Sequence, residues 1–283
     1  MNYDTSQEPT LVLGGSGKVG RRVVDRLTAR GVRVRIGSRS GEPRFDWEDR
    51  STWGAVLEGV GSAYVSHYWD ARPGAAETLG SFADLAVESG VPRLVLLSGR
   101  GEEEAERGER AVRYSGAELT VVRSTWFAQN FSEDYWREQV QGGEVALPAG
   151  GVPEPFVDAG DVADVAVAAL TDDRHIGELY ELTGPRLLTF TEAVLEISRA
   201  VGREVRYVPL SIEDFAVAAG DQGVPSEVVE GLTFLFGEVL DGRNARLADG
   251  VQRALGREPR DFSDYARDAA TSGVWNPTTT RAA

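Results

Sequence analysis

The chain has 283 residues, a formal net charge of −15, no cysteine and two histidines, His67 and His175. Without cysteine it cannot form disulfides, thiolate metal sites or iron–sulfur clusters, and two histidines cannot build a histidine-rich metal centre. Redox chemistry would therefore need a bound organic cofactor. An acidic surface repels nucleic-acid phosphates and anionic lipid headgroups, so we expect neither as a partner. Lys18 is the only lysine, so any mechanism that needs a lysine has to use it.

Residues 1–9 are polar and acidic, unlike a secretory signal or a transit peptide. No apolar run approaches the ~20 residues that span a membrane. We therefore expect a soluble cytoplasmic protein that has no membrane partner and acts on a small molecule. A homodimer is compatible with the sequence.

Predicted strands and helices alternate along the first half of the chain. Strands are predicted over residues 11–13, 32–36, 44–47, 63–67, 94–97 and 119–123. Helices are predicted over residues 18–30, 51–57, 75–89 and 104–114. This alternation predicts an α/β fold of the Rossmann type, in which a doubly wound parallel sheet carries helices on both faces.

The alternation loosens in the second half. We predict a helix over 161–170, a strand over 179–182, a helix with a threonine cap over 191–201, and mostly polar helices from 211 onward. Residues 1–131 are expected to form a dinucleotide-binding domain to which 151–183 contribute. Residues 132–150 and 184–283 are expected to form a smaller, interleaved, mostly helical substrate-side region, frayed over 276–283.

The turn after the first predicted strand is rich in glycine. Gly15, Gly17 and Gly20 match G-x-G-x-x-G, and a second register that starts at Gly14 matches G-x-x-G-x-x-G. Glycine permits a tight turn and a close approach of the backbone to a pyrophosphate, and the helix N-terminus that follows favours phosphate. Because the motif lies between a strand and a helix, we prefer this interpretation to a plain turn. The predicted phosphate loop is Gly14, Gly15, Ser16, Gly17, Lys18, Val19 and Gly20.

The end of the second predicted strand bears on the choice of cofactor. An NAD-specific site places Asp or Glu there, whereas this chain has Ser38 and Arg39. Arg39 can direct two N–H donors at a 2′-phosphate and Ser38 can add a hydroxyl, which favours NADP (NADPH) over NAD. The alternative is that Arg39 is one of many solvated loop arginines. Asp46 is expected to contact the adenine, and Trp47 and Ser66 are further predicted cofactor contacts.

Several motifs that follow the predicted strands resemble one known family. They are Gly14-Gly-Ser-Gly-Lys18, Ser38-Arg39, Phe45-Asp46-Trp47, Leu97-Ser98, Glu109 before Ser115-Gly116, Arg123-Ser-Thr-Trp126-Phe127, Asn130-Phe131, Pro155-Phe156-Val157-Asp158 and Asp161-Val-Ala. Together they resemble the NmrA-like branch of the atypical short-chain dehydrogenases/reductases over nearly the whole chain. More narrowly, Thr-Trp-Phe-x-x-Asn-Phe, Gly-Pro near 184 and Leu-Gly-Arg-x-Pro near 255 resemble the subgroup with the fungal ergot-alkaloid reductases, of the agroclavine and festuclavine synthase type. Those enzymes use NADPH to reduce an iminium, so the resemblance implies an NADPH-dependent reductase.

One departure from typical short-chain dehydrogenases bears on mechanism. Their Tyr-x-x-x-Lys pair passes a proton to a carbonyl, but Lys18 lies in the phosphate loop and Tyr114 is followed four residues later by Glu118. The acceptor is therefore expected to be already electrophilic, such as an iminium, a quinone or a conjugated enone. Positioning against the nicotinamide would then supply most of the rate.

Candidate catalytic residues follow the fourth and fifth predicted strands, because ligands bind beyond the carboxyl ends of parallel strands. Ser98 or Tyr68 could hydrogen-bond a substrate oxygen, and His67 could donate a proton. The alternatives are a serine that caps a helix and an aromatic residue that covers the cofactor. His175 is expected to be solvated in the loop over 172–176.

An aromatic cluster follows the sixth predicted strand. Its aromatic members are Trp126, Phe127, Phe131 and, one turn later, Tyr135 with Trp136, and Asn130 lies among them. Such a cluster suits a flat, polycyclic or aromatic substrate, and core packing is the alternative.

Three aspartates could suggest a metal, but we predict none. Asp158 and Asp161 flank a predicted helix start, where carboxylates cap N–H groups and match the helix dipole, and Asp164 follows them. Two other functions stay open: a non-catalytic NAD(P) sensor that acts through a partner, and a non-redox enzyme on the same fold.

Overall fold

The computed structural model describes residues 8–277, which form two compact units. Unit 1 contains residues 8–124, 159–182 and 248–258, and unit 2 contains residues 125–158, 183–247 and 259–277. The sequence suggested boundaries at 131, 151 and 183 and did not anticipate that 248–258 belongs with unit 1. Whether the units act as cofactor and substrate domains stays a prediction. Most of the tail predicted to fray, residues 278–283, lies outside the described residues.

Unit 1 is built on a six-stranded parallel sheet in the order β2-β1-β3-β4-β5-β7. The strands are β1 (Thr10–Leu13), β2 (Val34–Gly37), β3 (Ser62–Val65), β4 (Arg93–Gly99), β5 (Glu118–Ser124) and β7 (Leu179–Leu182). The strand order reverses between β1 and β3, and doubly wound sheets bind ligands at such a switch point, beyond the carboxyl ends of the strands. The predicted Rossmann-type fold is confirmed.

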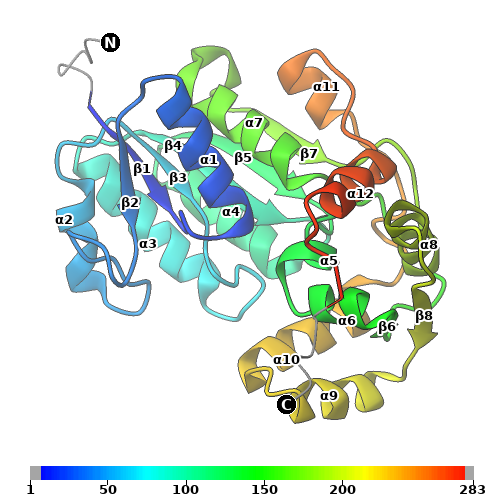
Figure 1. Ribbon diagram of the computed structural model, residues 1–283. Coiled ribbons are helices and arrows are strands. Elements are labelled where there is room, and N and C mark those ends of the chain that lie inside the picture. The colour runs from blue at the N-terminus through cyan, green and yellow to red at the C-terminus, as the bar shows by residue number, and fades with distance from the viewer. Residues whose placement is uncertain (1–7, 278–283) are drawn as a thin grey trace, which may run out of the picture. The chain divides into compact units, whose positions relative to one another are not determined.

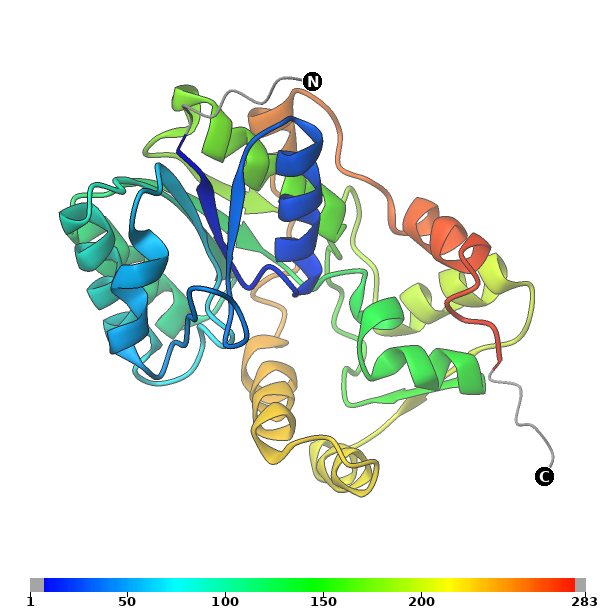
Figure 2. The same ribbon diagram turned by 60° about the vertical axis from the view of Figure 1, so that its left-hand side comes forward.

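Helices cover both faces of this sheet (Figures 1 and 2). They are α1 (Lys18–Ala29), η1 (Arg50–Thr52), α2 (Trp53–Leu57), α3 (Ala75–Glu88), α4 (Glu103–Tyr114), α7 (Ala159–Thr171), η2 (Asp173–His175) and α11 (Gly250–Leu255). On one face Trp53, Phe82 and Val112, from α2, α3 and α4, join one apolar core with strand residues such as Leu94. α1 and α7 lie against each other on the opposite face. The predicted helices that became α1, α3 and α4 are correct to within a residue at each end.

The predicted strand over 44–47 is wrong. Only Asp46 forms a bridge there, and its partner is Asp49, three residues further along the chain. Side chains take the backbone groups of Asp46 that a sheet would need: its N–H donates to the Thr52 hydroxyl at 3.0 Å, and its carbonyl accepts from the Trp53 indole at 2.8 Å. The segment is therefore a turn, and β7 supplies the sixth strand.

Unit 2 is mostly helical and contains a separate aromatic core. Its elements are α5 (Asn130–Glu133), α6 (Trp136–Gly142), β6 (Glu144–Leu147), α8 (Phe190–Val201), β8 (Arg206–Pro209), α9 (Ile212–Asp221), α10 (Ser226–Phe234), the π-helix η3 (Leu235–Val239) and α12 (Phe262–Thr271). β6 and β8 form a two-stranded parallel sheet. Phe131, Phe156 and Phe190 are buried in the core, and the Trp275 indole donates to the Phe131 carbonyl at 2.7 Å.

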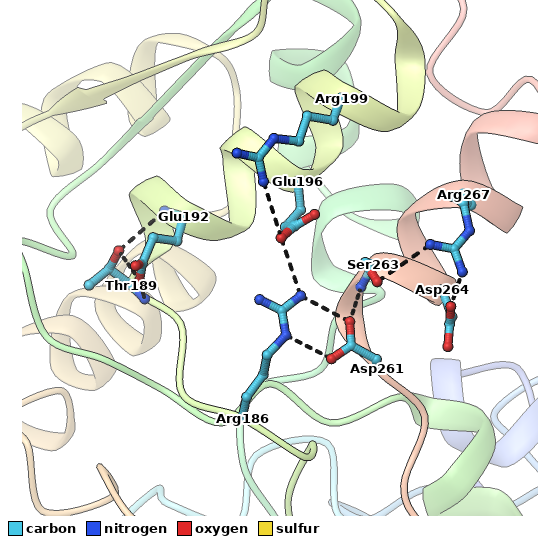
Figure 3. A network of polar contacts seen from close by, with 9 residues as sticks. All are labelled: Arg186, Thr189, Glu192, Glu196, Arg199, Asp261, Ser263, Asp264 and Arg267. Atoms are coloured by element: carbon cyan, nitrogen blue, oxygen red, sulfur yellow. Dashed lines mark hydrogen bonds and ion pairs between the residues drawn. The ribbon is translucent and has the colours of Figure 1, made fainter.

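A polar network holds the start of α8 beside the start of α12 (Figure 3). Thr189 and Glu192 form a capping box, in which each side chain accepts a hydrogen bond from the other residue's backbone N–H. Arg186, just before this helix, donates to both carboxylate oxygens of Asp261, which in turn caps α12. The helix predicted over 191–201 with a threonine cap begins one residue earlier, at Phe190, and its cap is Thr189.

The prediction that His175 is solvated is wrong. Its side chain is buried, and Nδ1 lies 2.8 Å from the Tyr180 hydroxyl. Its carbonyl also accepts a hydrogen bond from Thr120, far away in sequence on β5. These contacts pin the η2 turn against the sheet, and burial lowers the pKa of His175.

Within residues 8–277, no helix is both long and apolar enough to cross a lipid bilayer. A cytoplasmic location and a homodimer stay predictions.

Candidate functional site

The glycine turn after β1 can be made only with glycine at its contact points. Gly14 has a φ of +70°, which favours glycine. A Cβ on Gly20 would lie 2.1 Å from the Gly14 carbonyl oxygen, and one on Gly15 would lie 2.7 Å from the Ile36 side chain. Ser66, which follows β3, borders the same turn. A Cβ on Gly14 would lie 3.4 Å from the Cβ of Ser66. The backbone is therefore folded as tightly as a pyrophosphate-binding turn requires.

The N-terminus of α1 has the features of an anion-binding site. Its N-cap is Gly17, no side chain caps its N–H groups, and its first turn has no acidic residue. Ser16 and Gly17 are exposed, whereas the Val19 side chain is buried in the core. Val19 could thus contact a ligand only through its backbone. The N-terminus of this twelve-residue helix, which no side chain caps, fits the phosphates of a dinucleotide.

The loop after β2 presents Arg39 to solvent. The Ser38 carbonyl accepts from the N–H groups of Gly41 and Phe45, at 3.1 and 2.9 Å, and so closes a turn with Arg39 at its tip. In the part of the chain that the structure describes, Arg39 forms no ion pair, whereas nearby Arg44 is bound to Asp46 at 2.7 Å. The predicted 2′-phosphate residues therefore lie on a fixed turn, and the arginine is available to an anion.

The predicted adenine contacts lie in a well-ordered turn. The Asp46 carboxylate accepts from Arg44 and from the Glu48 N–H at 3.2 Å, so most of its hydrogen-bonding capacity is already used. Trp47 packs edge-on against Trp53 and lies 5.0 Å, between ring centroids, from His67. The contact of Asp46 with the adenine and that of Trp47 with the cofactor stay predictions.

His67 and Tyr68 follow β3 and stack on each other, with ring centroids 4.7 Å apart. The His67 Nδ1 accepts the N–H of Trp69 at 3.2 Å. In a neutral ring the proton must then lie on Nε2, which becomes a hydrogen-bond donor. Burial lowers the pKa of His67, so the neutral form dominates at pH 7. The Tyr68 hydroxyl is exposed and donates to Glu48 at 2.6 Å.

Ser98 on β4 lies inside a buried polar network. Its hydroxyl donates to Glu109 at 2.6 Å, and Glu109 accepts two hydrogen bonds from Arg123 on β5. Arg123 also contacts Glu181 on β7 at 3.3 Å. This chain of contacts ties α4 to three neighbouring strands. A catalytic role for Ser98 stays a prediction that no contact in the structure supports.

Two carboxyl groups that the sequence did not single out meet at the end of β4. The Gly99 N–H donates to Asp70 Oδ2 at 2.9 Å, and a Cβ on Gly99 would lie 2.2 Å from Glu102 Oε1. Burial raises the pKa of Asp70 to about 6 and that of Glu102 to about 8, the latter helped by the charge on Asp70. Their places just beyond β3 and β4, on the ligand side of the sheet, were the signal that could have identified them.

The predicted substrate residues lie in unit 2 and differ in exposure. Phe131 is fully buried and packs against Phe156 and Phe262, so core packing accounts for it. Trp126 is partly buried and stacks on Phe236 at 5.0 Å, and Tyr135 is exposed. Phe127 and Asn130 are partly exposed. Except for Phe131, these residues keep surface that a substrate could touch.

Each of the three aspartates near α7 pairs with an arginine. Asp161 lies 2.7 Å from Arg257, which also holds Asp164 at 2.6 Å, and Asp158 lies 3.3 Å from Arg260. Asp161 is in the first turn of α7, as expected for a carboxylate that matches the helix dipole. Among the residues described, no group of three or more acidic or histidine side chains is arranged to hold a metal ion.

Together these features define the class of protein. A glycine turn and an uncapped helix on the first strand of a doubly wound parallel sheet are the marks of a dinucleotide-binding fold. The chain belongs to the NmrA-like family, whose model matches residues 107–266. The resemblance expected from the motifs is therefore confirmed.

Two relatives match nearly end to end. The uncharacterized oxidoreductase YesF of Bacillus subtilis is 32% identical over 95% of this chain and 97% of its own length. Agroclavine dehydrogenase of Claviceps fusiformis is 30% identical over 94% and 98% of the two chains. The narrower resemblance to the ergot-alkaloid reductases is thus confirmed as well.

Solved structures confirm the fold. A triphenylmethane reductase of Citrobacter sp. complexed with NADP(H) superposes with a TM-score of 0.74, at 20% identity over 92% of this chain and 99% of that one. NmrA, a negative transcriptional regulator in complex with NAD, superposes with a TM-score of 0.68, at 18% identity over 94% and 97%. The same fold thus occurs in a reductase and in a regulator.

Proposed function

We propose that the chain is an NADPH-dependent reductase that transfers hydride to an activated C=N, C=C or quinone-type acceptor in a small, polycyclic or aromatic metabolite. The observation that carries the choice of cofactor is the turn at Ser38 and Arg39, because Arg39 forms no ion pair with any described residue and no acidic residue stands at the end of β2. The full-length similarity to agroclavine dehydrogenase and to an oxidoreductase supports the reaction class.

The residues of unit 1 would bind NADPH in extended form along the ends of the strands. Gly14–Gly20 and the α1 N–H groups would hold the pyrophosphate, and Arg39 with Ser38 would hold the 2′-phosphate. Asp46, Trp47 and Ser66 remain the proposed contacts for the rest of the nucleotide. Bound NADPH supplies a hydride, which is the two-electron reductant that this cysteine-free chain lacks.

The chain's own contribution to the reaction would be orientation and hydrogen bonding. The neutral His67 offers an Nε2–H donor that could bind an acceptor oxygen or nitrogen. The Tyr68 hydroxyl would have to turn its proton away from Glu48 to do the same. Trp126, Phe127, Asn130 and Tyr135 remain the proposed substrate contacts, because aromatic faces suit a flat acceptor.

A direct experiment tests the cofactor and the reaction together. NADPH and NADH are titrated into the purified protein, and the decay of cofactor absorbance is then followed with quinone, enone and imine acceptors. We expect tighter binding of NADPH and turnover of at least one acceptor. Tighter binding of NADH would refute the assignment of Arg39.

The second candidate function is a dinucleotide sensor. The fold shared with NmrA, a transcriptional regulator that was solved with NAD, favours it, as does the missing Tyr-x-x-x-Lys pair. Binding of either cofactor without turnover of any acceptor class would support the sensor. Conversion of a substrate without net oxidation of NADPH would instead point to a non-redox enzyme.

A further inference from the structure

The missing Tyr-x-x-x-Lys pair leaves open which group supplies a proton, and the end of β4 offers one. Asp70 and Glu102 approach the same residue, Gly99, from two different loops. Gly99 lacks a side chain, and this allows the Glu102 carboxyl to lie against its Cα. Within the described residues, no arginine or lysine forms an ion pair with either carboxyl group. Two carboxyl groups held together without a cation do not both ionise readily, so they tend to share a proton.

The charged neighbours of the pair do not relieve this repulsion. Glu109 faces Asp70 and raises its pKa further, but Glu109 is itself neutralised by Arg123. Arg100, next to Gly99 on the chain, pairs with Glu181 at 3.4 Å. Arg123 and Arg100 are therefore engaged by other carboxylates, and Arg72 donates to the Tyr68 hydroxyl.

A second observation points to a ligand at the same place. The Tyr64 hydroxyl, on β3, is completely buried beside Ser66 and Asp70, yet it has no hydrogen-bond partner of acceptable geometry. Burial and the charge of Asp70 raise the pKa of Tyr64, so it remains an O–H donor. A buried hydroxyl that no described residue pairs with in good geometry is rare in folded proteins, although the Ser66 side chain lies close enough to influence its pKa. This O–H can therefore donate to a ligand that brings an acceptor to the site.

We propose that Asp70 and Glu102 share one proton near neutral pH, and that Glu102 passes it to the acceptor during reduction. The proposal rests on the reductase function proposed above. Asp70 is the positioning residue, because its charge keeps the proton on Glu102.

The step balances for a conjugated enone. The enone accepts a hydride at its β-carbon, the C=C bond breaks, and the electron pair moves to the oxygen as an enolate, while NADPH becomes NADP⁺. The O–H bond of Glu102 then breaks, its proton bonds to the enolate, and both carboxyl groups are left ionised. Water restores the proton afterwards. An iminium differs, because hydride alone turns it into a neutral amine and no proton is needed.

This difference provides the test. Glu102→Gln should slow reduction of a neutral enone or quinone by about 10²-fold or more, the usual effect of losing a general acid, and should leave the rate with a cationic N-alkyl iminium unchanged. Glu103→Gln is the matched control, since Glu103 is the next residue, is exposed and pairs with Arg107. Glu103→Gln should change neither rate.

A second readout does not depend on turnover. The carbonyl stretch of a protonated carboxyl group, followed by infrared spectroscopy of the NADPH-free protein, should disappear from the wild type as pH rises through about 8. Glu102→Gln should remove this band and Glu103→Gln should keep it. Asp70→Asn should shift its loss to lower pH, because the charge that opposes ionisation of Glu102 is gone.

Equal slowing with both acceptors, or a wild-type protein that lacks the band below about pH 8, would overturn the proposal. If the wild type reduces no acceptor at all, the proposed reductase function fails, and with it the delivery of the proton. The infrared band would still decide separately whether the pair holds one.

Discussion

Arg186 donates a hydrogen bond to each carboxylate oxygen of Asp261, from Nε to Oδ2 at 2.7 Å and from Nη2 to Oδ1 at 2.9 Å. This contact joins the segment before α8 to the start of α12, as Figure 3 shows. The guanidinium holds the pKa of Asp261 well below its usual range. A carboxyl group with a depressed pKa stabilises the fold above its unfolded pKa of about 3.9, and that stability is lost as pH falls toward the folded value.

Asp261→Asn should therefore destabilise the protein at neutral pH and matter less in acid. About 1 kcal/mol is expected, because the side chains are 37% and 26% exposed and solvent screens the pair. Denaturant unfolding at about pH 7 and about pH 3 would measure the difference. Asp264→Asn, which removes the exposed pair with Arg267 on α12, is the control and should have little effect at either pH. An equal loss at both pH values would contradict the role of the ion pair.

Arg39→Asp should weaken NADPH binding far more than NADH binding. It replaces a charge-assisted donor to the 2′-phosphate with a repelling carboxylate, for an expected cost of about 2–3 kcal/mol, or tens- to over a hundredfold in NADPH affinity. Isothermal titration with both cofactors measures the ratio. Arg44→Gln, in the same loop but at an arginine bound to Asp46, should change the two affinities alike. An equal loss of both affinities in Arg39→Asp would show that Arg39 does not contact the 2′-phosphate.

Gly20→Ala should disrupt the glycine turn, since its new Cβ would lie 2.1 Å from the Gly14 carbonyl. The backbone must shift, and we expect both cofactor affinities to fall at least tenfold, together with a loss of stability of about 1–3 kcal/mol. Gly54→Ala on α2 is the matched control, because a Cβ there meets nothing within 4 Å and alanine favours the helix. Normal NADPH binding by Gly20→Ala would show that the turn does not need this glycine.

His67 should act as a neutral hydrogen-bond donor. Because burial holds its pKa below the ordinary value of 6.5, the neutral form predominates as pH rises from about 7 toward 8. With a cationic N-alkyl iminium, which needs no proton from Glu102, the pH profile of kcat/KM should therefore be flat over this range, and His67→Gln, which keeps an N–H donor, should retain more activity than His67→Ala. A decline centred between pH 6.5 and 7 that disappears in His67→Gln would instead identify an imidazolium acid.

Local patterns in the sequence were enough to predict the sheet, the glycine turn and α1, because each depends on residues close together in the chain. The failures involve contacts between distant residues. The segment over 44–47 has the composition of a strand, but Thr52 and Trp53 bind the backbone of Asp46. His175 lies in a polar turn, yet Tyr180 and Thr120 enclose it.

In the candidate site, too, features set by neighbouring residues could be predicted, and those set by contacts between distant residues could not. The proposed phosphate-binding residues follow from a motif and a strand end, so sequence reasoning could name them. The role proposed for Glu102 depends on Gly99 lacking a side chain and on Asp70 arriving from the loop after β3. Nothing in the local sequence indicates that these carboxyl groups meet, and Ser98 was singled out although its hydroxyl serves Glu109.

The interleaving of the two units limits how this chain can be engineered. Unit 1 takes β7 and α7 from 159–182 and α11 from 248–258, and Arg257, just after α11, clamps Asp161 and Asp164 of α7. A chimaera joined at one point would therefore leave its sheet without an edge strand and α7 without its arginine. Testing whether unit 2 sets substrate preference, as predicted, therefore calls for transplanting each of its stretches from a relative between unchanged junctions, or for altering single side chains in place.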